Sequence, residues 1–565
     1  MQEEKKLPDV FALQADRRVL VCTTQQQRQP RHPVKSARID ARGGQIAVDP
    51  YTRGEDSGQN QWTWQHYNAT VGYDGTFGRH VVSASAGILY NIYKTDFSQN
   101  GAAGKMVEYR HMTVNGAVNY AYDDRYVATF SFAADGSDNY RPGNRWGFYP
   151  SLGLGWIVSR ERFLRDSRTV DLLKLRASVG KNGWDPMGEM RYLWEGYYTG
   201  RGGLNTGNSE HTWHGGTALS YLPNPGIFAE KSLKYDAGID LRLWNRLSLN
   251  VDLFLEKRSG IVTQDWMIPG ASGVDNPPYR NIGRMTNKGF EVQLSWADRI
   301  GDFNYALTGM ASYNSNKVDY MAEVVTVPTA ARTGRRLDAL FGYVADGFYD
   351  WDDFDVGGEL REGLPKPTFG AVQPGDIKYK NLNGDTVIDE NDQTAIGDSY
   401  LPKLQYSFSL AASYKGFDLF ALFQGAAGRD VNLLDAPLQN IAFRDNGNVY
   451  GIAEGRWAYY PEQGIDTRAT ATYPRLSLQD NSNNYRNSTL WKRSGDFLKL
   501  RNVELGYTFA QPSLSKAGIS KIRIYLSGVN LLTVSRLMRD YDIDPEILSG
   551  HPALKSYNLG LTVTF

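Results

Sequence analysis

Hydrophobic and polar residues alternate along most of the chain after residue 62. The clearest case is the C-terminal end, where one face is apolar and the other is small or polar: Tyr557, Leu559, Leu561, Val563 and Phe565 against Asn558, Gly560, Thr562 and Thr564. This alternation predicts β-strands with one apolar face and one polar face. We expect about fifteen of them, near residues 62–76, 78–93, 107–123, 125–138, 145–159, 171–180, 232–243, 246–258, 287–299, 303–317, 403–415, 416–427, 497–510, 520–531 and 556–565.

The lengths of the strands and of their connections favour a membrane barrel. Many strands reach about ten residues, enough to cross a bilayer when tilted, whereas soluble strands most often have about five or six. Short connections alternate with long ones, as periplasmic turns alternate with extracellular loops in outer-membrane barrels. The long connections lie at 94–106, 181–231, 259–286, 318–402, 428–496 and 532–555. The pattern therefore predicts an all-β fold, an antiparallel transmembrane β-barrel with long extracellular loops. A soluble β-sandwich is the alternative.

The N-terminal part of the chain lacks this alternation. Residues 1–60 show no clear period, and residues 25–32 form a polar run, QQQRQPRH. We therefore expect an irregular or poorly ordered segment over 1–60 and the barrel over 61–565. Charged residues stand where the apolar stretch of a signal peptide would lie, so we expect no signal peptide in this chain.

Composition narrows the possible functions. Lys and Arg number 62, as do Asp and Glu, so the formal net charge is zero and a nucleic-acid partner is not expected. The single cysteine, Cys22, excludes an internal disulfide framework and a cysteine-cluster metal site. Aromatic residues make up 13% of the chain and glycines number 58, which favours many strands and turns.

The end of the chain carries a second barrel feature. Asn558, Gly560, Val563 and Phe565 fit the order polar-x-Gly-x-x-apolar-x-aromatic. This resembles the C-terminal signal by which outer-membrane barrels are recognised for insertion. The same strand therefore predicts both the fold and its location in the cell outer membrane.

Several sequence blocks resemble one family. They are DGSDNYRPGNRWGFYPS (135–151), NPGIFAEKSLKYDAGIDLRL (224–243), NIGRMTNKGFEVQLSW (281–296), PGDIKYKNLNGDTVIDENDQTAIGDSYLPKLQYSFSL (374–410) and FLKLRNVELGYTF (497–509). Together they resemble the C-terminal part of SusC/RagA-type TonB-dependent transporters from the outer membrane of Bacteroidetes-like bacteria. The resemblance is spread over residues 62–565 in the family's order.

The resemblance implies a function and partners. Such transporters are plugged barrels of 22 strands that import oligosaccharides or oligopeptides with a SusD-like surface lipoprotein. TonB drives them through the plug, and no plug domain is recognisable in this sequence. We therefore expect an incomplete barrel in contact with outer-membrane lipid, a fragment that lacks its own connection to TonB. The alternatives are a passive porin-like channel, a truncated gene product without function, and a secreted β-protein that binds or cleaves glycans.

One loop has the oxygen spacing of a Ca²⁺ site. Candidate ligands follow each other at intervals typical of such loops: Asn381, Asn383, Asp385, the carbonyl of Val387, Asp389 and Asp392. Asn at the first position, Thr386 at the usual glycine position and Asp in place of the final Glu depart from the pattern. The alternative is a polar turn whose Asn and Asp side chains bond to their own backbone. Apart from this possible Ca²⁺ we expect no cofactor.

The long loops also carry many aromatic residues, which could stack on sugars or peptides. The candidates are Trp194, Tyr197, Tyr198, Trp213, Trp266, Trp351 and Trp457. The alternative for each ring is packing between loops or a place in an interfacial aromatic belt. Catalysis is not expected, because His211 and His214 lack the Glu of a zinc protease motif and no nucleophile elbow or Walker loop occurs.

Overall fold

The computed structural model describes residues 10–27, 57–95, 107–185, 191–196, 198–206, 212–272, 276–325, 327–435, 449–478, 481–509, 518–548 and 550–565. One antiparallel sheet of 16 strands dominates them, and the order of the strands in the sheet follows their order in the chain. Its strands are β1 (Val10–Gln27), β2 (Ser57–Phe77), β3 (His80–Thr95), β4 (Val107–Tyr122), β5 (Tyr126–Ser137), β6 (Trp146–Ile157), β7 (Val170–Trp184), β10 (Glu230–Leu243), β11 (Leu247–Gln264), β12 (Tyr279–Ile300), β13 (Phe303–Tyr320), β20 (Leu404–Tyr414), β21 (Phe417–Ala427), β26 (Phe497–Phe509), β27 (Lys521–Ser535) and β28 (Ser556–Thr564).

All of the strands expected from the alternation are present, which confirms the predicted fold class. The prediction of an irregular segment over residues 1–60 is wrong in two places. Val10–Gln27 forms strand β1, and β2 begins at Ser57. β1 pairs along its whole length with β2, from Val10 opposite Asp74 to Gln27 opposite Ser57. β1 is recognised as a strand by its backbone pairing with β2. The alternation of residues within one segment does not reveal such pairing, so the sequence did not predict this strand.

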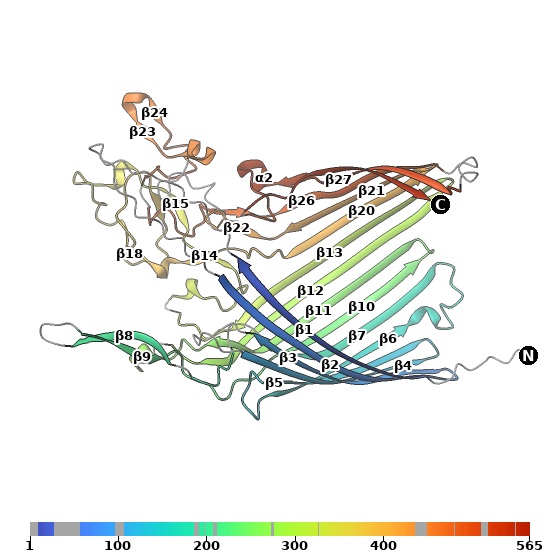
Figure 1. Ribbon diagram of the computed structural model, residues 1–565. Helices are drawn as coiled ribbons and strands as arrows, with labels where there is room; N and C mark the ends of the chain where they lie inside the picture. Colours follow the sequence, from blue (N-terminus) through green and yellow to red (C-terminus); the bar gives the residue numbers. More distant parts are fainter. Residues whose placement is uncertain are drawn as a thin grey trace, which may run out of the picture.

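The sheet curves into a barrel wall. In Figure 1, β1 and β2 cross in front of β10 to β13 with the opposite inclination, as tilted strands on opposite walls of a barrel do. Among the described residues, β1 and β28 are the two ends of the strand order. The short turns lie at one end of the wall, where the C-terminus is also found, and the long loops lie at the other end.

The two faces of the wall differ in chemistry. On β27, Ile524 and Leu526 are 43% and 56% exposed on the outer face. Arg523, Tyr525 and Ser527 alternate with them on the inner face. This is the apolar-out, polar-in pattern of a membrane barrel.

Three long connections fold together into a second body at the loop end. Residues 321–403, 428–496 and 536–555 all contribute buried side chains to one hydrophobic core, and we call their described part the loop body. Its core residues are Tyr343, Ile377, Tyr379, Ile388, Val431, Leu433, Ala453, Tyr473, Trp491, Leu537 and Ile543. These three long loops are therefore packed structure, and Figure 1 shows their labelled strands gathered at the loop end.

The elements outside the wall are short. The strands are β8 (Tyr198–Thr206), β9 (Thr212–Leu219), β14 (Leu340–Gly342), β15 (Ala345–Phe348), β16 (Lys366–Pro367), β17 (Ile377–Tyr379), β18 (Val387–Ile388), β19 (Thr394–Gly397), β22 (Asp430–Asn432), β23 (Tyr459–Tyr460), β24 (Ile465–Asp466) and β25 (Lys492–Ser494). The helix α2 (Arg536–Tyr541) and the 3₁₀ turns Val158–Arg160, Gly270–Ser272, Pro328–Ala330, Trp351–Asp353, Glu390–Asp392, Gly451–Gly455 and Pro461–Gln463 complete them. In the described part of the chain, every helix is too short or too polar to cross a membrane.

Candidate functional site

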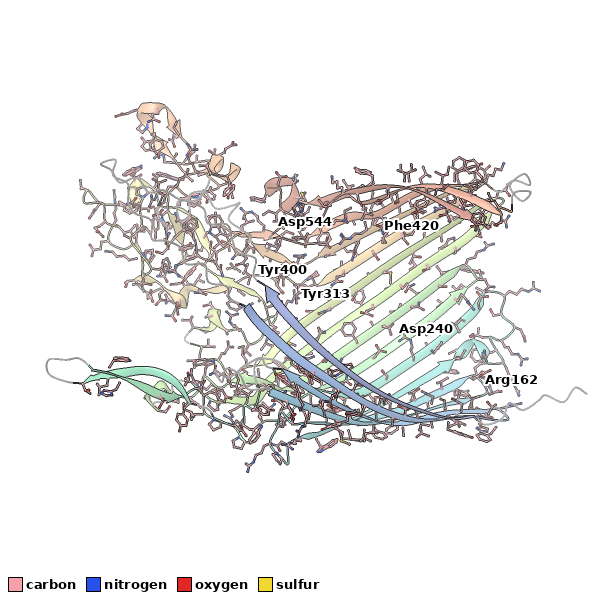
Figure 2. The ribbon with its side chains drawn as sticks, viewed as in Figure 1. Arg162, Asp240, Tyr313, Tyr400, Phe420 and Asp544 are labelled. Atoms are coloured by element: carbon pink, nitrogen blue, oxygen red, sulfur yellow. The ribbon has the colours of Figure 1, made fainter. Side chains whose placement is uncertain are left out.

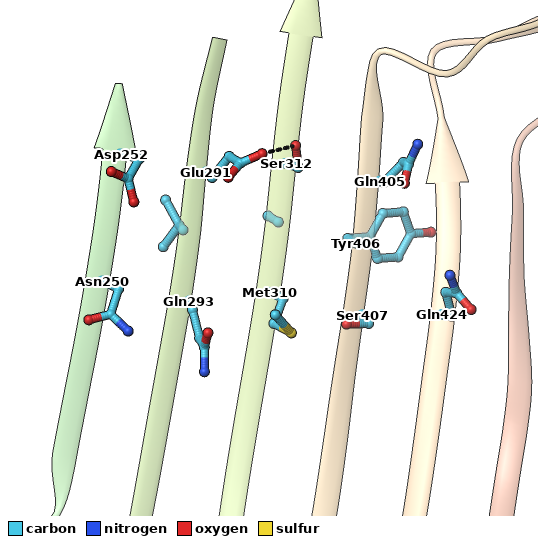
Figure 3. Close-up of a pocket in the computed structure, with 12 residues that line it drawn as sticks. Asn250, Asp252, Glu291, Gln293, Met310, Ser312, Gln405, Tyr406, Ser407 and Gln424 are labelled. Atoms are coloured by element: carbon cyan, nitrogen blue, oxygen red, sulfur yellow. Dashed lines mark hydrogen bonds between the residues drawn. The ribbon is translucent and has the colours of Figure 1, made fainter. Parts of the chain in front are cut away.

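The inner face of the wall presents hydrogen-bonding side chains over several neighbouring strands. Two cross-strand rows line a hollow of about 330 Å³ (Figure 3): Asn250, Gln293, Met310, Ser407 and Gln424 in one row, and Asp252, Glu291, Ser312 and Gln405 in the other. Ser312 Oγ donates a hydrogen bond to Glu291 Oε1 at 3.3 Å. Amides, carboxylates and hydroxyls at this density can bind a polar solute or a polar protein surface.

Fixed ion pairs cross the strands of the same face. Arg176 on β7 donates to Asp252 Oδ2 at 2.6 Å and to Asp240 Oδ1 at 3.3 Å. A Cβ at Gly238 would lie 2.5 Å from the Arg176 Cζ, so only glycine leaves room for the guanidinium to lie on the sheet. Figure 2 labels Asp240 on this part of the wall.

A second cluster repeats this arrangement near the C-terminal strands. Arg523 donates to Asp418 Oδ1 at 3.0 Å and to Glu504 Oε1 at 2.6 Å. A Cβ at Gly506 would lie 2.5 Å from the Arg523 Nη2. Both clusters therefore combine one arginine, at least two carboxylates and one glycine, since Arg176 also lies 3.7 Å from Asp236, and they hold charges at defined places along the inner wall.

A buried ionic cluster joins the wall to the loop body. The Lys499 ammonium on β26 is 1% exposed and donates to Asp544 Oδ1 and to Glu546 Oε2, both at 2.7 Å. Arg501 pairs with Glu546 as well. Burial opposes ionisation of Asp544, but the hydrogen bonds from Lys499 and from the Glu546 and Ala553 backbone outweigh it and lower the pKa of Asp544. Figure 2 places Asp544 at the loop end, opposite to Arg162 at the turn end.

A second buried carboxylate connects two loops inside the loop body. The Asp376 side chain is 0% exposed and accepts hydrogen bonds from three side chains: Arg475 Nε at 2.7 Å, Asn481 Nδ2 at 3.0 Å and Asn484 Nδ2 at 2.9 Å. The backbone N–H of Gln373 donates to its other oxygen at 2.8 Å. Since Asp376 and its side-chain partners lie in different long connections, this cluster fixes one connection against the other.

The aromatic candidates from the sequence lie on separate elements. Tyr198 and Trp213 are 74% and 60% exposed on the β8–β9 hairpin, whereas Trp266 and Trp351 are 53% and 56% exposed in two other loops. Trp194 packs against a small core at the rim of the wall. The remaining two candidates differ from these, as Trp457 is only 7% exposed in the loop body and Tyr197 lies outside the described residues. Four rings are thus available to a ligand, but they do not form one platform.

The predicted Ca²⁺ loop is held by its own hydrogen bonds. Asn381 Oδ1 accepts from the Gly384 N–H at 2.6 Å, and Asn383 Oδ1 accepts from the Asp385 N–H at 3.0 Å. Asp385 and Asp389 likewise accept from backbone N–H groups two residues on, those of Val387 and Asn391, and the buried Asp392 accepts from the Leu382 and Asp389 N–H groups.

Within the described ranges, no group of three or more His, Cys, Asp or Glu side chains converges as a metal site requires. The predicted ligands also include the Asn381 and Asn383 side chains and the Val387 carbonyl, and Ca²⁺ binding over residues 381–392 stays a prediction.

The residues of the insertion signal lie in the last strand of the wall. Asn558 and Gly560 on β28 pair with Ser527 and Tyr525 on β27, and Val563 pairs with Ile522. A Cβ at Gly560 would lie 2.1 Å from the Tyr525 Cζ, so the glycine gives this ring its place on the inner face. Phe565 follows the strand and is 86% exposed. Recognition for insertion stays a prediction.

The charged clusters around Arg176, Arg523, Lys499 and Asp376 were not predicted from the sequence. Their partners lie far away in the chain, such as Asp376 and Arg475, so no local pattern reports them. Two of these clusters have a signal in the sequence, which is a glycine on the polar face of a strand: Gly238 beside Arg176, and Gly506 beside Arg523.

The curved antiparallel wall, its apolar outer face and its polar inner face define an outer-membrane β-barrel. The chain belongs to the family of TonB dependent receptor-like β-barrels, because the family match extends over residues 22–531. Proteins of this family are outer-membrane transporters, and the family is not one of enzymes.

The relatives confirm the resemblance to the SusC/RagA type. TonB-dependent receptor P3 of Formosa agariphila is 26% identical over 554 residues, which cover 87% of this chain and 51% of that protein. TonB-dependent receptor SusC of Bacteroides thetaiotaomicron is 25% identical over 485 residues, or 80% of this chain and 43% of SusC. The chain thus spans about half the length of the curated relatives it matches. The fold is similar to that of the RagAB peptide importer in its closed-closed state, with a TM-score of 0.70 and 20% identity, over 100% of this chain and 61% of that one.

Proposed function

We propose that this chain forms the wall and the outer loops of an importer in the outer membrane, which takes up oligosaccharides or oligopeptides together with a SusD-like lipoprotein. The observation that carries the proposal is the combination of a polar inner wall with a loop body packed at one end of it. The similarity to SusC and to the RagAB peptide importer supports it. TonB would act through a plug domain, which is not among the described residues.

The inner wall and the loops contribute differently to this function. The amide and carboxylate rows around Gln293 and Glu291 offer hydrogen bonds to a polar solute on its way inward. Exposed rings such as Trp351 and Trp213 offer flat apolar faces to sugars or peptide side chains at the entrance. The loop body gives the lipoprotein a folded surface to contact.

Uptake in cells tests the proposal. The gene is deleted in its host, and uptake of labelled oligosaccharides and of labelled oligopeptides is measured with and without a protonophore. We expect uptake of one of the two classes to be lost on deletion and on collapse of the proton gradient. In the complemented strain, Trp351→Ala should weaken uptake about fivefold, because one aromatic contact contributes about 1 kcal/mol. Phe163→Ala serves as the matched control, since this ring is 72% exposed at the turn end.

Other results would contradict the proposal. Uptake that depends on the gene but not on the proton gradient would indicate a passive porin-like channel. Unchanged uptake of both classes would indicate a gene product without transport function. Affinity purification from the outer membrane, followed by mass spectrometry, should recover a lipoprotein if the loop body contacts one.

A further inference from the structure

The outer face of the wall contains a cavity that the proposed transport does not use. It has a volume of about 370 Å³ and lies at the loop end of β3 to β6, below residues 191–194. Its floor is one cross-strand row on the outer face, in which each residue pairs with the next: Tyr90, Met112, Gly136 and Trp146. The Trp146 ring leans over Gly136, where a Cβ would lie 2.9 Å from it.

The height of this cavity matches the upper boundary of the apolar band. On β4, the outer face below it is apolar, with Val114 and Val118 37% and 44% exposed. The band ends near the turn at Tyr120, ten residues from Arg110 in the sequence. Ten residues extend about 33 Å along a strand. Because barrel strands tilt by about 40°, these residues span a height of roughly 25 Å across the membrane, which is the height of a barrel's apolar band. Arg110 therefore lies at the level of the outer headgroups.

The cavity is lined by rings and by more cations than anions. Arg110 and Arg145 are its arginines, and both are exposed. Of the acids nearby, Asp138 is paired with the buried Arg191 at 2.9 Å, and Glu108 is shared between Arg110 and Lys94. Among the charged side chains that line the cavity, Arg110 and Arg145 therefore face one carboxylate, that of Asp138, while the lining residues His111 and Ser137 bond to Asp135 and Asp185.

Residues 191–194 close the cavity from above. The Tyr192 hydroxyl donates to the Glu108 carbonyl at 3.0 Å, which fixes this segment on the rim of the wall. Trp194 also lines the cavity, and its buried indole N–H has no hydrogen-bond partner among the described residues. An unpartnered buried donor is costly unless a further group accepts from it.

We infer that this cavity binds the phosphate-bearing headgroup of an outer-leaflet lipid. Arg110 and Arg145 pair with the phosphate oxygens, since guanidinium groups bind phosphate in a two-pronged geometry. Met112 and Trp146 contact the upper part of the acyl chains, as residues of an aromatic belt do. The inference rests on the proposed function only for the orientation of the wall in the outer membrane.

Lipid binding to the purified full chain in detergent tests the inference by native mass spectrometry. The probes are a diphosphorylated lipid A, the same lipid without phosphates, and inorganic phosphate. We expect Arg110→Gln/Arg145→Gln to weaken binding of the phosphorylated lipid about 25-fold, at roughly fivefold per basic residue. The control is Arg79→Gln/Arg160→Gln, which removes two exposed arginines at the turn end, each paired with one acid, and should leave binding unchanged.

Three results would overturn the inference. These are equal losses in both double variants, equal affinity for the lipids with and without phosphates, and displacement of the lipid by inorganic phosphate, which would indicate a site for free anions. Protection of the wall from trypsin shows that each variant is folded. Substrate uptake is a separate measurement, so a failure of the proposed transport function would not be mistaken for a failure of the lipid site.

Discussion

At the scale of single residues, Lys499 shows how a buried charge is stabilised at the end of the wall. A lone ammonium in this place would lose several kcal/mol of hydration free energy. Asp544 and Glu546 both accept hydrogen bonds from it, and Arg501 balances the second carboxylate. Two cations and two anions therefore meet where strand β26 enters the loop region.

We expect Asp544→Asn to destabilise the last loop by about 2 kcal/mol, because it leaves the buried Lys499 ammonium without one of its two charged acceptors. Limited proteolysis of residues 536–555 in the folded barrel measures this change. Asp540→Asn is the matched control, as Asp540 forms an exposed pair with Arg539 on the neighbouring helix, and such pairs contribute little. Equal cleavage rates in both variants would show that Lys499 does not hold the loop.

The same cluster predicts a dependence on pH. The pKa of Asp544 in the folded protein is lowered from its ordinary value of 3.8. A lowered folded-state pKa stabilises the fold above the ordinary value, and this stabilisation is lost as the pH falls through the lowered value. Cleavage of the last loop by pepsin should therefore rise as the pH is lowered below 3.8 in the wild type, and less so in Asp544→Asn.

At the scale of elements, the wall strands could be predicted from the sequence because the alternating pattern lies within each strand. A strand that crosses a bilayer has an apolar outer face and a polar inner face along its whole length, and β11 and β28 show this without reference to their neighbours. β1 is different, since Asp16, Arg17 and Arg18 interrupt its apolar positions. Its pairing with β2 is visible only in the structure.

The two faces of a single strand give a direct test of this arrangement. Leu526→Arg places a charge near the middle of the outer face of β27 and should cost about 2–4 kcal/mol in the membrane. Ser527→Arg changes the adjacent residue on the inner face, near Glu504, and should be tolerated. The fraction of chain that inserts into vesicles and resists trypsin measures both. Similar losses from the two substitutions would contradict the assignment of inner and outer faces.

At the scale of the whole molecule, the loop body is the part that the sequence did not predict. Its core combines Ile377, Val431 and Leu537 from three connections that are far apart in the chain. Each connection alone appears as a long polar loop, because the apolar residues are scattered and their partners lie elsewhere. The predicted loop positions were therefore right, but their mutual packing was not predictable from local patterns.

Asp376 tests whether the loop body is one unit. Asp376→Asn should lower the free energy of unfolding of the loop body by about 3 kcal/mol, because Arg475 loses its buried anionic partner. Pulse proteolysis in urea measures it at sites in residues 449–478. Asp352→Asn, at an exposed residue of the same connection, is the control. If only residues near Asp376 become sensitive, the loop body is not cooperative.

The strand order of the wall has a consequence for how the molecule assembles. Every neighbouring pair in the wall is consecutive among the wall strands, so each pair can form as soon as its second strand is present. The core of the loop body, in contrast, needs Leu537 and Ile543, which come late in synthesis. Maturation therefore has two stages, in which the wall grows strand by strand and the loop end acquires its shape only after the last long connection is in place.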